Sequence, residues 1–261
     1  MHGRGPECGR RALLGALAST ALLGPSGSAQ GQAQARSSST LPQLQRSAEA
    51  GNRSSQAALG GRYLNGYGVP KNYAEAVKWL RLSVAQGEPD GMVNLARMYH
   101  YGWGVPKDDT TAFALNSNAA ALGNIYAQND LAVMYREGFG VQRDLKAAFD
   151  WAKKPADEGY AVAQAAIAGH YIRGWGVAKD EALAVRYYRL AADQKNPSAL
   201  AGLAYAYLDG VGGLRPDRAE AIRLFTEAAE RGNAYAADKL AELGAARPTT
   251  APAGAVAPTA A

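Results

Sequence analysis

The 261-residue chain contains a single cysteine, Cys8, and this scarcity excludes several kinds of chemistry. Cys8 precedes the first apolar stretch of the chain, so cleavage of a signal sequence there would leave the mature protein without any cysteine. A disulfide framework, a thiolate zinc site and a cysteine nucleophile are therefore excluded.

Histidine is nearly as scarce, and only His100 and His170 follow the apolar stretch. Neither has further ligands at helical spacing, and the sequence contains no HExxH, EF-hand or GxSxG motif. Its glycine pairs are not followed by the Lys-Ser/Thr of a phosphate-binding loop. We therefore expect no metal, no cofactor and no catalytic residue, in a protein that is not an enzyme.

Excess charge is small. The net charge is +5, and three arginines against one glutamate place +2 of it in the first 35 residues. The remaining charge of about +3 is too weak to indicate nucleic-acid binding.

Long apolar runs are also absent, because the longest stretch, 12–24, falls short of the roughly 20 residues that span a bilayer. It follows Arg4, Arg10 and Arg11 and precedes small residues that allow cleavage after Ala29 or Ala35. This order is typical of a secretory signal at 1–35 and predicts a periplasmic or secreted protein with no stable membrane span after cleavage. Arg10-Arg11 fits twin-arginine export and general secretory export equally well.

What the sequence does contain is a repeat with a period of 36 residues. The same residue type recurs at that spacing in several registers at once. The tyrosines are Tyr63, Tyr99, Tyr135, Tyr171 and Tyr207, and two glycines follow each of them, from Gly66 and Gly68 to Gly210 and Gly212. One extra residue near Gly213 lengthens the fifth copy to 37.

Each copy is predicted to form two helices. Apolar residues at helical spacing precede the glycine pair, which ends the first helix because glycine readily takes a left-handed conformation. Aspartates at period 36, with Asn72 in the first copy, are expected to cap the second helix. That helix ends at glycine in every copy except the fourth, where Lys195-Asn196 stands instead. Pro155, inside the third copy's second helix, predicts a kink or a shortened helix.

One copy is too small to fold alone. Ordering 36 residues costs about 50 kcal/mol, and about eight large apolar side chains return at most about 3 kcal/mol each. The copies must therefore stack on one another. The predicted domains are a signal peptide at 1–35, a linker with an N-terminal capping half-repeat at 36–51, a repeat array at 52–244 and a disordered tail at 245–261. The copies within the array are 52–87, 88–123, 124–159, 160–195 and 196–232, followed by a cap at 233–244.

The pattern Leu-Ala-x-x-Tyr-x-x-Gly-x-Gly-Val-x-x-Asp-x-x-x-Ala resembles the Sel-one-like repeat (SLR) family, a relative of the tetratricopeptide repeats. The resemblance implies an all-α fold, a right-handed α-solenoid of antiparallel helix pairs, and a role in protein–protein interaction. It also implies an exported bacterial protein that regulates envelope signalling or exopolysaccharide production. Cysteine-rich members described as acting on β-lactams have disulfides that this chain cannot form.

Two surfaces are candidates for binding. One is a row of aromatic residues between the paired glycines, which would suit a peptide or a sugar chain if exposed, unless each ring packs on the next repeat's turn. This row consists of Tyr67, Trp103, Phe139 and Trp175, with Val211 in the fifth copy.

The second surface is the free face of the first helices, which the analogy with tetratricopeptide repeats places on the concave side, where a protein partner would lie. Its candidate residues are Asn94, Arg97, Tyr101, Asp130, Glu137, Arg173, Tyr205 and Asp209. Ordinary solvated helix surface is the alternative. The expected function is a protein-binding scaffold or adaptor, with peptidoglycan or polysaccharide binding as the alternative and hydrolysis of cell wall or β-lactams as the least supported.

Overall fold

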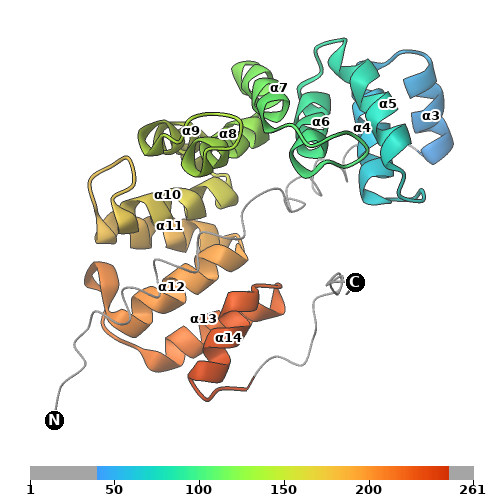
Figure 1. Ribbon diagram of the computed structural model, residues 1–261. Helices are drawn as coiled ribbons and strands as arrows, with labels where there is room; N and C mark the ends of the chain where they lie inside the picture. Colours follow the sequence, from blue (N-terminus) through green and yellow to red (C-terminus); the bar gives the residue numbers. More distant parts are fainter. Residues whose placement is uncertain (1–39, 247–261) are drawn as a thin grey trace. The chain divides into compact units, whose positions relative to one another are not determined.

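The computed structural model describes residues 40–246, and the regular secondary structure of this part of the chain is all helix (Figure 1). The predicted signal peptide at 1–35 and most of the predicted tail lie outside the described residues. The chain divides into two compact units after Pro155. We call the described residues 40–155 the N-terminal unit and 156–246 the C-terminal unit.

The described residues form twelve α-helices and one short 3₁₀ helix, η1 (Val211–Gly213). The helices that begin in the N-terminal unit are α3 (Leu41–Glu49), α4 (Arg53–Asn65), α5 (Tyr73–Val84), α6 (Pro89–Tyr101), α7 (Asp109–Ala121), α8 (Ile125–Glu137) and α9 (Leu145–Asp157). Those of the C-terminal unit are α10 (Ala161–Arg173), α11 (Glu181–Asp193), α12 (Pro197–Asp209), α13 (Arg218–Glu230) and α14 (Ala234–Glu242).

The helices pack in consecutive pairs, as the period of 36 predicts. In the N-terminal unit α4 packs on α5 and α6 on α7, and in the C-terminal unit α10 packs on α11 and α12 on α13. The first helices of neighbouring repeats also touch, since α4 contacts α6 and α10 contacts α12. Single helices lie at the two ends of the series, α3 against α4 and α14 against α13. The prediction of an all-α array of helix pairs is confirmed.

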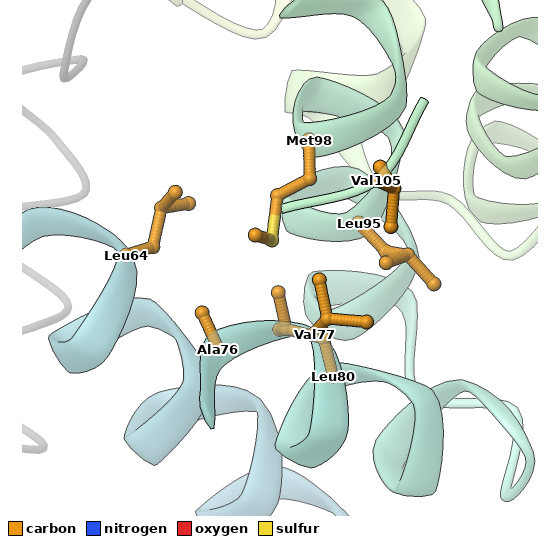
Figure 2. Close-up of a cluster of buried hydrophobic side chains, with 7 residues drawn as sticks. All are labelled: Leu64, Ala76, Val77, Leu80, Leu95, Met98 and Val105. Carbon is orange, nitrogen blue, oxygen red and sulfur yellow. The ribbon is translucent and has the colours of Figure 1, made fainter. Parts of the chain in front are cut away.

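The hydrophobic cores are shared between repeats. Figure 2 shows one of them, in which side chains from α4 and α5 meet side chains from α6 and the turn that follows it. Its buried members are Leu64, Ala76, Val77, Leu80, Leu95, Met98 and Val105. Because residues of two successive repeats complete this cluster, neither repeat buries its apolar side chains by itself.

In three of the turns the second glycine, Gly104, Gly140 or Gly212, lies where the turn approaches the start of the preceding second helix. A Cβ on Gly104 would lie 2.8 Å from Tyr73 Cβ, and one on Gly212 would lie 2.5 Å from the Glu181 carbonyl oxygen. On Gly140 it would overlap the Asp109 carbonyl oxygen. The first glycine, by contrast, is the left-handed cap that ends each first helix, as predicted.

The period-36 aspartates are helix caps, as the sequence predicts. Asp108, Asp180 and Asp217 each accept a hydrogen bond from the backbone amide three residues on, and Asn72 does the same in the first copy. Asp144 accepts from the amides of Lys146 and Ala147. These carboxylates therefore stabilise helix starts. Asparagines at 52, 124, 196 and 233 cap the first helices in the same way, which the sequence analysis did not predict.

Pro155 does not shorten its helix, so this part of the prediction is wrong. Helix α9 has 13 residues, as α7 does, and Pro155 lies in its last turn with its ring buried. There the missing amide removes a single hydrogen bond, the one to the Trp151 carbonyl.

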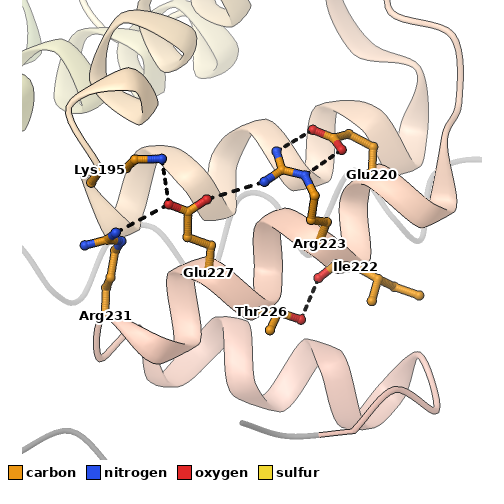
Figure 3. Close-up of polar contacts among 7 residues, drawn as sticks. All are labelled: Lys195, Glu220, Ile222, Arg223, Thr226, Glu227 and Arg231. Carbon is orange, nitrogen blue, oxygen red and sulfur yellow. Dashed lines mark hydrogen bonds and ion pairs between the residues drawn. The ribbon is translucent and has the colours of Figure 1, made fainter. Parts of the chain in front are cut away.

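Lys195 occupies the position where the other second helices end in glycine. Its φ of 62° is the only positive one among non-glycine residues in the described chain. Its ammonium group lies 2.9 Å from Glu227 on α13, which also pairs with Arg223 on the same helix and with Arg231 directly after it (Figure 3). Lys195 therefore combines an unfavourable backbone conformation with a partly exposed ion pair.

Replacing Lys195 separates these two effects. We expect Lys195→Gly to exceed Lys195→Ala in unfolding free energy by about 1 kcal/mol, because both lose the ion pair but only glycine relieves the left-handed conformation. Urea unfolding followed by circular dichroism measures the difference. Equal stability of the two variants would show that the conformation costs nothing.

Gly140→Ala tests the close approach of the turn to α7. We expect it to lower the unfolding free energy by about 3 kcal/mol or more, because the added methyl group overlaps the Asp109 carbonyl oxygen. The matched control is Gly87→Ala, which has a similar φ of 73° with no atom within 4 Å of the new Cβ and should cost only about 1 kcal/mol. Similar losses in thermal or urea unfolding would contradict the packing argument.

Candidate functional site

Two residues of the predicted polar face, Arg97 and Asp130, come together between α6 and α8. Arg97 Nη2 lies 3.7 Å from Asp130 Oδ2, with side-chain exposures of 16% and 5%. The first helix of the second repeat is thus joined to that of the third by a largely buried ion pair. Asp130 is therefore not open to a partner in this structure.

Burial dominates the electrostatics of this pair. Loss of solvent raises the pKa of Asp130 from 3.8 to about 6, although Arg97, a hydrogen bond from Asn129 and the charge interaction with His100 all lower it. Within the described residues, Arg97 Nε, Asn129 Oδ1 and Asp130 Oδ2 are buried without a hydrogen-bond partner. Burying such atoms without hydrogen bonds costs free energy, so this ion pair lowers the stability of the N-terminal unit relative to a fully hydrogen-bonded one.

Tyr101, at the end of α6, connects the polar face with the aromatic row. Its ring stacks on Trp103 with centroids 4.4 Å apart and planes at 20°, and Trp103 stacks in turn on Tyr73 of the preceding repeat at 5.8 Å and 2°. His100 contacts both Tyr101 and Phe139, at 4.7 and 4.9 Å. We call these five rings the aromatic cluster. Tyr101 is its most open member, with 36% of its surface exposed.

The predicted aromatic row is not uniformly exposed. Tyr67 is 54% exposed, whereas Trp103, Phe139 and Trp175 are half-buried. Trp103 packs back on Tyr73 in the repeat before it, whereas the packing alternative placed each ring on the next repeat's turn. The row therefore consists of one open ring, Tyr67, and partly covered ones.

The other residues of the N-terminal unit predicted for the polar face are Asn94 and Glu137. Asn94 on α6 is half-buried. Glu137 is exposed at the end of α8, where its carboxylate accepts a hydrogen bond of 2.6 Å from Arg136 Nε. The partner-binding role of these residues stays a prediction.

In the C-terminal unit, Arg173 lies over the ring of Trp175, 4.6 Å from its centroid, and donates to the Gly169 carbonyl oxygen at 3.4 Å. The adjacent Tyr188, from α11, fills the space left by Gly202, where a Cβ would lie 2.6 Å from the ring. Burial raises the pKa of Tyr188 to about 12, partly opposed by Arg173, and its hydroxyl has no hydrogen-bond partner among the residues of known placement.

Tyr205, also predicted for the binding face, is buried. Its hydroxyl hydrogen-bonds to that of Tyr235 on α14, and burial followed by this bond raises its pKa above the ordinary value. Lys239 lies 5.8 Å from the centroid of each of these two rings. Of the predicted residues in this unit, Asp209 alone is exposed.

The two histidines of residues 40–246 make short contacts within the fold. His100 Nδ1 lies 2.5 Å from Asp109 Oδ1, and His170 Nδ1 lies 2.7 Å from the Trp175 carbonyl oxygen. Residues 40–246 contain no group of three or more His, Cys, Asp or Glu side chains that could hold a metal ion. In the same region no helix has both the length and the apolar character needed to cross a bilayer.

A buried glutamine that recurs between repeats was not among the predicted residues. The buried amides of Gln56, Gln128 and Gln164 donate to the carbonyl oxygens of Ala48, Ala120 and Ala156, each eight residues earlier, at 3.1, 3.4 and 3.2 Å. Each bond satisfies a carbonyl at the end of the preceding helix. Because these glutamines are separated by 72 and 36 residues, the period itself was the signal that could have found them.

Asp130→Asn tests the burial of the carboxylate. The folded pKa lies above the unfolded one, so the stabilising contribution of Asp130 is complete below pH 3.8 and is lost as the pH rises through about 6. Between pH 3.5 and 7.5 the wild type should therefore lose about 3 kcal/mol of unfolding free energy relative to Asp130→Asn, at 1.36 kcal/mol per pKa unit. Urea titrations at matched pH measure this, and parallel pH profiles would contradict it.

The sequence matches the Sel1 repeat family at five consecutive positions, 53–88, 89–124, 125–160, 161–196 and 197–233. Each match begins one residue after the predicted copy.

Solved bacterial structures are similar to the chain. A protective antigen of uropathogenic Escherichia coli with an SLR fold is 32% identical with a TM-score of 0.65, covering 80% of this chain and 45% of that protein. A Sel1 repeat protein from Oxalobacter formigenes is 30% identical with a TM-score of 0.68, covering 74% and 76%. An immunity protein from Pseudomonas aeruginosa is 25% identical with a TM-score of 0.52, covering 70% and 68%.

This chain thus spans less than half the length of the E. coli antigen. No curated protein matches it. Five in-phase matches over most of the described residues, on a fold of paired helices, show that the chain belongs to the Sel1 repeat family.

Proposed function

We propose that the chain is a non-enzymatic protein-binding scaffold of the bacterial periplasm, with a role in envelope signalling or exopolysaccharide production. The observation that carries the binding role is the pair of exposed tyrosines, Tyr67 and Tyr101, at the ends of first helices in adjacent repeats. Tyr101 is held by its stacking on Trp103 and lies beside the ion pair of Arg97 and Asp130. A rigid aromatic side chain with a polar rim is the usual composition of an interface hot spot.

Export is supported by the N-terminal arginines and the apolar stretch 12–24. Two similar proteins are described as a protective antigen and an immunity protein, and neither name denotes an enzymatic activity. Sel1 repeats are interaction scaffolds, which supports a protein partner over a small-molecule substrate.

Binding of peptidoglycan or another polysaccharide is the second candidate, and the exposed ring of Tyr67 favours it. The packing of Trp103 argues against polysaccharide binding, because Tyr73 and Tyr101 already stack on that ring and leave little of its face for a sugar. The protein partner is therefore the better-supported proposal.

The test compares two double variants in the producing cell. We expect Tyr67→Ser with Tyr101→Ser to lower the recovery of chemically crosslinked partner by about tenfold or more, as the loss of hot-spot residues does. The control, Leu82→Ser with Leu122→Ser, removes two side chains of similar exposure from the second-helix side of the same unit and should leave recovery unchanged. Equal recovery of partner by both variants would contradict a role of Tyr67 and Tyr101 in binding.

The same proteins distinguish the polysaccharide alternative. Purified wild type should stay in solution when peptidoglycan is sedimented. Co-sedimentation that is lost in the tyrosine variant and kept in the leucine variant would support the second candidate instead.

A further inference from the structure

The ion pair of Arg97 and Asp130 is unusual in its position. It joins the first helices of two successive repeats, α6 and α8, and it lies beside Tyr101. The shortest distance between the charged groups is 3.7 Å, and Arg97 Nε has no hydrogen-bond partner in the described part of the chain. The pair therefore holds two repeats together through a long and incompletely satisfied contact.

Several groups act on this carboxylate. Arg97, His100 and Tyr101 face it from α6, and Asn129 on α8 donates a hydrogen bond to it. Asp109, at the start of α7, is paired with His100 and with Lys107, so α7 acts on Asp130 through His100. Burial outweighs these favourable groups, because a carboxylate removed from water keeps its charge only at a large free-energy cost.

We propose that Arg97 and Asp130 form an acid-released latch on the binding face: when Asp130 takes up a proton from solvent, Arg97 loses its counter-ion and turns its guanidinium outward beside Tyr101. A partly buried guanidinium without a counter-ion is costly, and the long arginine side chain can carry the charge to water without moving α6. The binding face then gains one exposed positive charge where it previously had a neutral pair.

The latch opens as the pH falls through about 6, because the pKa of Asp130 is about 6. Its consequence for binding rests on the proposed function. An acidic partner should bind more tightly at pH 5 than at pH 7.5, since release of Arg97 adds an exposed positive charge to the face.

The test is a pH titration of the full chain by NMR, without any partner. The side-chain carboxyl carbon of Asp130, identified by its absence in Asp130→Asn, should titrate with a midpoint near 6. The Nε–H signal of Arg97 should move with the same midpoint. In Asp130→Asn, which keeps the side-chain size, the Arg97 signal should stay at its acid position at every pH. The expected control is Arg223, whose partner Glu220 has a lowered pKa, so its signal should stay constant from pH 5 to 8.

A second variant keeps the proposal falsifiable. Arg97→Gln removes the cation that lowers the pKa of Asp130, so the Asp130 midpoint should rise above that of the wild type. A wild-type midpoint near 4, or an Arg97 signal that does not follow Asp130, would overturn the latch. Because no partner is present, a failed partner experiment leaves this result intact, and a failed titration leaves the proposed scaffold function intact.

Discussion

The shared core between successive repeats is the constraint on which the rest of this structure depends. Leu64, Ala76 and Leu80 of the first repeat are buried only together with Leu95 and Met98 of the second. Because each helix pair needs its neighbour, first helices of adjacent repeats come into contact, α4 with α6 and α10 with α12. The same stacking brings Arg97 on α6 within reach of Asp130 on α8, which forms the candidate site.

The packing of the turns against the preceding repeat also positions the aromatic cluster. Gly104 allows its turn to approach Tyr73, and the same approach lets Trp103 stack on the Tyr73 ring. Tyr101 then stacks on Trp103 and stays partly exposed. A packing requirement of the repeat thus also fixes the orientation of a surface tyrosine. Such fixed side chains lose little entropy when a partner binds.

Much of the fold could be predicted from the sequence, because the residues that begin and end the helices recur in five copies at the same spacing. The aspartate caps, the glycine ends and the exception at Lys195 follow from backbone requirements that act within a few residues. The candidate site was harder, because burial depends on neighbours that lie about 30 residues away. The helical stripe contained Asp130 and Tyr205, but it could not show that Arg97 covers the first and Tyr235 pairs with the second. Similarly, the position of Gly202 does not reveal that Tyr188 of α11 fills its space.

A Sel1 helix pair of this chain has no stability of its own and folds only against its neighbours. The decisive measurement is circular dichroism of the single repeat 89–124 as an isolated peptide, beside the full chain at the same temperature. The isolated repeat should show little helix and no cooperative thermal transition. Native-like helix content that melts cooperatively would mean that a single helix pair is stable without its neighbours.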